Sequence, residues 1–179
     1  MLTFLSDPEQ KKINIRWDLR PGDMGSVIRL HGVLYAREYG YDHTFEGYVA
    51  AGLAEVAESF DSRRDRLWVA EQTGEIVGSI AIVKRSAGEA QLRWFLIDPR
   101  FRNLGLGRSL LQLALQFGKD RGYEIIYLWT LRGLESASHL YVSSGFIKTE
   151  EKTHILWGNM IAEERYELNI SPGGGTALA

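Results

Sequence analysis

The sequence predicts a mixed α/β fold in which helices flank a mostly antiparallel central sheet of about seven strands. Three apolar stretches, residues 67–72, 75–84 and 89–97, follow one another with only short turns between them, as in an antiparallel meander. After residue 97, helical and strand-like periodicities alternate. The stretch at residues 124–130 is apolar on both faces, which is typical of a buried strand with a parallel neighbour.

The remaining elements follow from periodicity. Residues 14–20 alternate apolar and charged side chains, which indicates a strand. Two helices are expected next, the first from an N-terminal cap at Asp23 to Gly40 and the second from Phe45 to Phe60. The later predicted elements are a helix from Gly107 to Gly122, the strand at 124–130, a helix at 134–144, and strands at 148–157 and 163–170.

The chain length of 179 residues suits one domain, which we place at residues 14–170. Residues 1–13 are expected to form an N-terminal arm. Residues 171–179 are rich in glycine, and we expect a disordered tail there.

Composition narrows the class of protein. The chain has 21 Lys and Arg residues and 23 Asp and Glu residues, so its net charge is −2, which argues against a nucleic-acid partner. The chain has no cysteine, and its four histidines lack the spacing of metal ligands, so no metal is expected. No window approaches the roughly 20 apolar residues that span a membrane. These features favour a cytoplasmic protein without membrane contact.

A glycine-spaced loop carries the strongest functional signal. Asp98-Pro99 ends the apolar stretch at residues 89–97, and the pattern Arg102-x-x-Gly105-x-Gly107 follows just where a helix should begin. The first turn of a helix offers free amide groups and the positive end of the helix dipole, and glycines leave these amides accessible. This combination, with arginines beside it, predicts a phosphate site.

A second motif makes the assignment more specific. Residues 137–146 read Ala-Ser-His-Leu-Tyr-Val-Ser-Ser-Gly-Phe, and the interval between the two motifs accommodates one helix and one strand. Together the motifs make residues 14–170 resemble the GNAT superfamily of acyl-CoA-dependent N-acyltransferases. In that fold the fourth and fifth strands, here 89–97 and 124–130, splay apart.

The resemblance implies acetyl-CoA as the donor. Its pyrophosphate would lie on the loop amides, with Arg102 and Arg108 supplying positive charge, and its pantetheine arm would pair with the fourth strand as another strand would. The residues implied in donor binding are Phe95, Leu96, Ile97, Arg102, Asn103, Leu104, Gly105, Leu106, Gly107, Arg108 and Ser109.

The resemblance also implies that Tyr141 is the general acid for the departing thiolate, although a tyrosine at this place can simply pack. Many relatives have a glutamate base early in the fourth strand, where this chain has Gln91, which cannot take a proton. Glu89 and His154 are the candidate bases. A water chain, or an amine that binds already neutral, is the further alternative.

The acceptor would bind across the splayed strands, near the link between the first two helices. That link and the fourth strand offer Tyr39, Tyr41 and Trp94. Aromatic walls suit an amine on an apolar body or a cation held over a ring. For Trp17 and Trp68 we expect a place in the core.

The sequence therefore predicts an N-acetyltransferase that moves an acetyl group from acetyl-CoA to a primary amine. The amine would belong to a small molecule or a peptide and would attack directly in a ternary complex. The alternative is a catalytically silent acyl-CoA-binding sensor, which Gln91 favours and Tyr141 opposes. A homodimer is compatible with these features.

Overall fold

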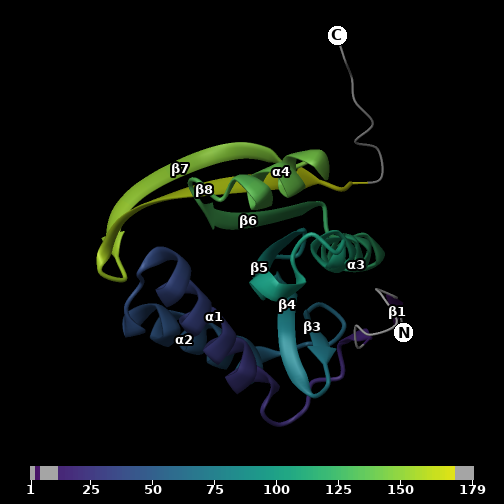
Figure 1. The fold of residues 1–179 in the computed structure, drawn as a ribbon. Helices are drawn as coiled ribbons and strands as arrows, with labels where there is room; N and C mark the ends of the chain where they lie inside the picture. Colours follow the sequence, from purple (N-terminus) through teal and green to yellow (C-terminus); the bar gives the residue numbers. More distant parts are fainter. Residues whose placement is uncertain (1–2, 5–11, 172–179) are drawn as a thin grey trace.

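The computed structural model describes residues 3–4 and 12–171 (Figure 1). One eight-stranded sheet runs in the order β1-β2-β3-β4-β5-β6-β8-β7. The strands are β1 (Thr3–Phe4), β2 (Ile13–Arg16), β3 (Arg66–Gln72), β4 (Glu75–Lys84), β5 (Glu89–Ile97), β6 (Ile125–Leu131), β7 (Ile147–Leu156) and β8 (Asn159–Asn169). The helices are α1 (Asp23–Tyr39), α2 (His43–Ser59), α3 (Leu106–Asp120) and α4 (Glu135–Ser143), with a short 3-10 turn at Pro99–Phe101.

All described strand pairs are antiparallel except β5 with β6, so the mixed, mostly antiparallel sheet is confirmed. The meander β3-β4-β5 follows the predicted boundaries closely. Excluding the two-residue β1, the sheet has the expected seven strands.

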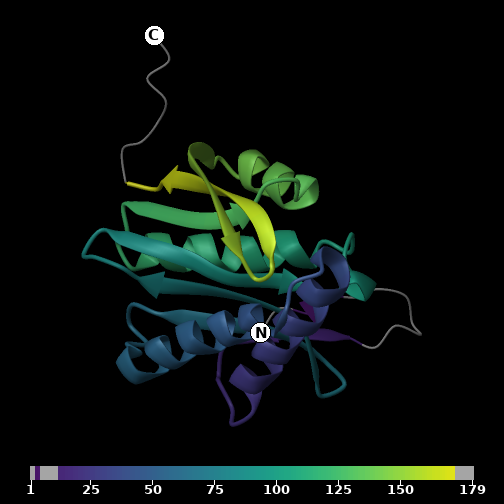
Figure 2. The same ribbon diagram turned by 90° about the vertical axis from the view of Figure 1, so that its left-hand side faces the viewer.

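Helices cover both faces of the sheet, as Figures 1 and 2 show. Side chains of α3 and α4 pack into one core with Trp68, Ile80 and Leu128, whereas those of α1 and α2 pack into a second core with Val69 and Ala81. Successive strand residues join opposite cores because side chains alternate across a strand. This explains why β4 is buried from Ile76 to Val83.

A buried ion pair fixes the start of α1. The guanidinium of Arg16 donates two 2.7 Å hydrogen bonds to Asp23 and a third to Glu71 of β3. The expected cap at Asp23 is wrong: Gly22 occupies the cap position, and the Asp23 carboxylate is committed to Arg16 and to the amide of Arg20.

Three further expectations have different outcomes. Trp68 is buried as predicted, but Trp17 lies beyond the end of β2 and is 49% exposed. Of the predicted N-terminal arm, Thr3–Phe4 forms β1 and pairs with β2, and Ile13 begins β2. The rest of the arm before Lys12, and the predicted tail from residue 172 on, lie outside the described residues.

Candidate functional site

A bulge in β5 shapes the site. Ser79 pairs with Leu96 and Ala81 with Arg93, so β5 uses one residue more than β4 over this interval. The extra residue is Trp94, which has φ 46°, and its carbonyl accepts a 2.6 Å hydrogen bond from the buried hydroxyl of Ser79. A bulge of this kind bends its strand and changes the face that later side chains occupy. Leu92 and Phe95 accordingly pack toward the same core, although they are three residues apart.

Beyond the bulge, β5 and β6 separate. They pair only from Glu89 to Gln91 on β5, and from Leu92 to Ile97 the edge of β5 that faces β6 has no strand partner in the described chain. The predicted splay of the fourth and fifth strands is thus observed.

A continuous cleft of about 1240 Å³ opens at this separation. One end is formed by the loop before α3, the start of α3 and the inner side of α4, and the other by α1, α2 and Trp157. β5 from Gln91 to Ile97 runs between these two ends. We call the end at α3 the loop end and the end at α1 and α2 the aromatic end.

The helix start at the loop end fits the predicted phosphate site. Gly105 caps α3 with φ 81°, and among the described residues no side chain caps the helix. The first internal bond of the helix is from the amide of Ser109 to the carbonyl of Gly105, so the amides between them face outward without a helical partner. The Ser109 hydroxyl donates to the same carbonyl at 3.1 Å. A Cβ on Gly107 would be 3.2 Å from Ile97 Cδ1, so this glycine also lets α3 approach β5.

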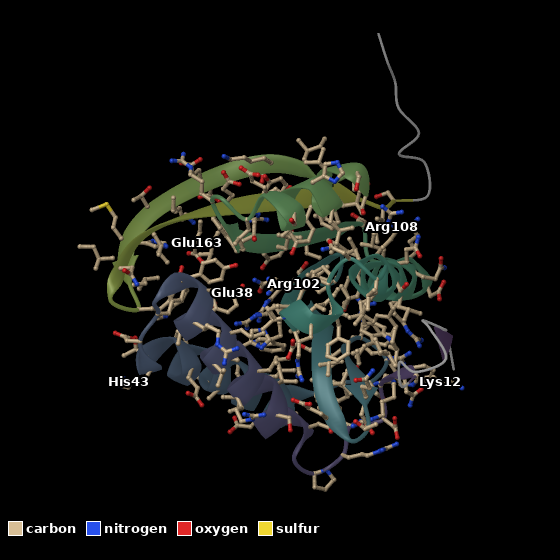
Figure 3. The ribbon with its side chains drawn as sticks, viewed as in Figure 1. Lys12, Glu38, His43, Arg102, Arg108 and Glu163 are labelled. Carbon is tan, nitrogen blue, oxygen red and sulfur yellow. The ribbon has the colours of Figure 1, made fainter. Side chains whose placement is uncertain are left out.

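The two arginines predicted beside this helix start have different surroundings. Arg102 donates to a carboxylate oxygen of Glu38 on α1 and to the carbonyl of Ile97, both at 3.0 Å. Arg108 is exposed and has no ion pair with any described residue. Figure 3 shows Arg102 together with Glu38 at the centre of the molecule and Arg108 beside α3. Arg108 is therefore the cation available to an anion at the loop end.

Tyr141 projects from α4 into the cleft. Its ring lies 6.2 Å from that of Phe95 and 5.8 Å from that of Phe146, and the residue is only 5% exposed. Burial raises the pKa of the Tyr141 phenol well above its ordinary value near 10. The phenol is thus protonated at neutral pH and able to donate.

The aromatic end joins residues that are distant in sequence. Tyr39 and Trp94, two of the three residues predicted to bind the acceptor, line it together with Tyr35, Tyr48 and Trp157. Tyr41 lies outside the lining, buried against Trp157 with ring centroids 5.2 Å apart. The turn after β7 reaches the link between α1 and α2, where the amide of Asp42 donates to the carbonyl of Trp157 at 3.3 Å. Figure 2 shows the β7–β8 hairpin extending to the helices here.

The two candidate bases lie outside the cleft. Glu89 pairs with Ile125 at the closed end of β5, away from the splay. His154 on β7 binds Glu163 of β8, with 2.7 Å between Nε2 and Oε2, and it is Glu163 that lines the cleft. Gln91 also lines the cleft, and its side-chain carbonyl accepts a 2.9 Å hydrogen bond from Arg85.

Sequence reasoning did not find Glu163. The residue stands in a charged stretch with Glu164 and Arg165 that looks like a solvated strand face, and nothing local distinguishes it. Only the pairing of β8 with β6 brings it to the cleft. Burial, with the Glu163 carboxylate nearby, raises the pKa of Tyr41 to about 12.

These features, a mixed sheet with splayed parallel strands and an open helix start at their separation, define a class of fold, and comparison with known proteins identifies the family. The sequence model of the acetyltransferase (GNAT) family matches residues 33–146. The chain belongs to this family.

Two relatives of this chain are N-acetyltransferases of mammals. N-acetyltransferase family 8 member 2 of Rattus norvegicus is 34% identical over 104 residues, which cover 55% of this chain and 46% of the relative. N-acetyltransferase 8 of Homo sapiens is 30% identical, covering 62% and 51%. The chain spans about half the length of these two relatives.

The fold is also that of solved acetyltransferases. A GNAT-family acetyltransferase from Staphylococcus aureus superposes with a TM-score of 0.72 at 20% identity, over 89% of this chain and 99% of that one. A putative acetyltransferase from Salmonella typhimurium, solved with its cofactor acetyl-CoA, has a TM-score of 0.70 at 13% identity, covering 93% and 99%.

Two observations concern other kinds of site. Within residues 3–4 and 12–171, no helix is long and apolar enough to cross a membrane. No group of three or more His, Asp or Glu side chains among the described residues is placed to hold a metal ion.

Proposed function

We propose that this chain is an N-acetyltransferase that transfers the acetyl group of acetyl-CoA to a primary amine of a small molecule or peptide. The observation that carries the proposal is the continuous cleft that joins an open helix start to an aromatic end, with Tyr141 on its wall. Such a cleft can hold donor and acceptor together, as direct attack requires.

The residues at the loop end fit the donor. The free amides at the start of α3 and the unpaired Arg108 would hold the diphosphate, since a helix start and an arginine both favour phosphate oxygens. The unpaired edge of β5 at Phe95, Leu96 and Ile97 would bind the pantetheine amides. The carbonyl of Ile97 already accepts a bond from Arg102, so we assign Arg102 the role of holding the loop against β5 and α1.

The transfer forms one bond and breaks one. The amine nitrogen attacks the thioester carbonyl, the carbon–sulfur bond breaks, and the products are an N-acetyl amide and the free thiol. Tyr141 supplies the proton that the departing sulfur takes up, because its buried phenol is protonated at neutral pH. The nitrogen of the acceptor loses two protons in all. The first leaves the ammonium before attack and must pass to a base, and the second leaves the nitrogen as the amide forms and restores the phenol of Tyr141.

Glu163 and His154 form the route that we propose for the first of these protons. Two carboxylates line the cleft, Glu135 at the exposed start of α4 and the half-buried Glu163. The hydrogen bond of Glu163 leads to His154, whose side chain is 36% exposed. The proton would pass from the acceptor to Glu163, directly or through water, and leave by the imidazole. His154 thus keeps the predicted role in deprotonation, through Glu163. Glu89 is the less suitable base, because it lies at the paired end of β5 and outside the cleft that would hold the amine.

The experiment that tests this route is a pH–rate series on Glu163→Gln and His154→Ala with acceptor amines of different pKa. We expect both variants to lower kcat and to remove the same limb of the profile. Glu150→Gln is the matched control, because Glu150 is a carboxylate on β7 that pairs with Lys152 outside the cleft. A profile that follows only the pKa of the acceptor in all variants would refute the route and indicate that the amine binds neutral.

The alternative function is a silent acyl-CoA-binding sensor. It is favoured by one observation: the side chain held by Arg85 at the start of the splay is the amide of Gln91, not a carboxylate. Release of free thiol from acetyl-CoA across a panel of primary amines separates the two functions. Binding of acetyl-CoA without any amine-dependent release would support the sensor.

A further inference from the structure

Arg93 lies at the aromatic end of the cleft and carries a positive charge. The proposed acetyl transfer gives this residue no role. It lies on β5 immediately before the bulged Trp94. Its guanidinium carbon is 4.6 Å from the centroid of the Trp94 ring and 5.9 Å from that of Tyr48. A guanidinium that lies over aromatic faces is held by them while its N–H groups, which lie in its own plane, stay available for a ligand.

The backbone of α2 makes room for this group. A Cβ added at Gly52 would be 2.8 Å from Nη2 of Arg93 and 3.2 Å from Nη1. Gly52 is buried in the middle of α2, where glycine is an unfavourable helix former. Its absent side chain is what lets the guanidinium rest against the helix.

Arg93 lacks the counter-charge that its neighbour in the cleft has. Arg102 is paired with Glu38, whereas the half-buried Arg93 forms no ion pair with any described residue. A half-buried charge without a partner costs free energy, which a ligand anion would offset. Within the same cleft, Glu163 supplies a negative charge for an ammonium group.

We propose that Arg93 binds the carboxylate of the acceptor, so that the acceptor is an amino acid with an apolar or aromatic side chain. The proposal rests on the proposed function and names its substrate class. A planar guanidinium binds a carboxylate through two parallel hydrogen bonds. The amine then faces Glu163 and Tyr141, and the apolar body lies among Tyr35, Tyr39 and Trp157.

The test compares three matched probes, L-phenylalanine, L-phenylalaninamide and phenethylamine, as acceptors with saturating acetyl-CoA. They share the amine and the ring and differ in the carboxylate. Because the amines differ in pKa, kcat/KM is compared at equal concentration of neutral amine. We expect the acid to exceed both other probes by about 10- to 100-fold, the range of a charge-assisted pair.

Three variants link that preference to Arg93. Arg93→Gln should bring the ratio of acid to amide close to one, and Arg93→Lys should restore part of it, because it keeps the charge and loses the two-pronged geometry. Gly52→Ala should also lower the ratio, since its Cβ displaces the guanidinium while alanine supports the helix. Arg29→Gln on the exposed side of α1 should keep the wild-type ratio.

The outcomes separate the two proposals. Acetylation of all three probes at similar efficiency, or a carboxylate preference that survives Arg93→Gln, would overturn the role of Arg93 and leave the proposed function intact. Binding of acetyl-CoA with no acetylation of any probe or of a wider amine panel would overturn both.

Discussion

Replacing Arg108 by glutamine should weaken acetyl-CoA binding through the phosphates alone. Arg108 is exposed beside the open start of α3 and has no ion pair with any described residue. Arg102 stands at the other side of the loop, but its guanidinium is occupied by Glu38 at 2.9–3.0 Å and by the carbonyl of Ile97. The sequence predicts positive charge beside the loop from both arginines, with a solvated helix position as the alternative for Arg108, and the structure gives the two side chains different surroundings.

The expected loss of binding free energy follows from the exposure of Arg108. An exposed ion pair contributes up to about 1 kcal/mol, and a charge-assisted hydrogen bond about 1.5–3 kcal/mol. A diphosphate carries more than one negative charge and Arg108 can donate more than one hydrogen bond, so a loss of about 1–2 kcal/mol is expected. This corresponds to a rise in Kd of about 5- to 30-fold.

The assay is titration with two ligands, acetyl-CoA and acetyl-pantetheine, which carries the thioester and both amides without a diphosphate. Arg108→Gln should raise the Kd of the first within the stated range and leave that of the second within about twofold. Arg102→Gln should change the ratio of the two constants by less than twofold, since its group already has partners. An equal loss for both ligands in Arg108→Gln, or a larger change of the ratio in Arg102→Gln, would refute the assignment.

Three further outcomes are expected. Tyr141→Phe should lower kcat by about 100- to 10,000-fold with the Kd of acetyl-CoA nearly unchanged, if chemistry limits turnover; wild-type turnover would leave Tyr141 a packing residue. Asp23→Asn should lower the free energy of unfolding in urea by about 2–4 kcal/mol, because it uncharges one partner of the buried Arg16 pair, whereas Asp18→Asn on an exposed pair should barely shift the midpoint. Burial lowers the pKa of His31 to about 4, below its ordinary value of 6.5, so the unfolded state binds a proton that the folded state does not. The free energy of unfolding should therefore be highest above pH 6.5 and about 2 kcal/mol lower at pH 5, and His31→Gln should remove this dependence on pH.

The parts that sequence predicts well are those whose cause is local. The meander β3-β4-β5 follows from short turns such as Thr73-Gly74, where both residues have positive φ. The open start of α3 follows from Gly105 and Gly107, because helix geometry alone leaves these amides without partners. The place of Tyr141 follows from a motif of ten residues.

The parts that sequence does not reveal depend on contacts between distant elements. Glu38 reaches Arg102 across 64 residues, and nothing near either residue indicates the pair. Glu163 enters the cleft because β8 pairs with β6, a crossover that the order of the strands in the chain conceals. Trp17 continues the alternation that predicts a strand over residues 14–20, but β2 ends one residue earlier, at Arg16, whose guanidinium is paired with Asp23 at the start of α1. Trp17 is therefore exposed and does not join the core.

One extra residue in β5 links the two ends of the cleft. Without the bulge at Trp94, side chains before and after it would keep one alternation, and Phe95 would face the aromatic end instead of packing against Tyr141. Because of the bulge, the side chains of Arg93 and Trp94 both lie at the aromatic end of the cleft, while those of Phe95 and Ile97 line its wall at the loop end. The same distortion stops pairing with β6 after Gln91 and so leaves a free edge. The hydroxyl of Ser79, which donates to the Trp94 carbonyl, is therefore a contact through which the body of the sheet fixes the loop end of the cleft relative to the aromatic end.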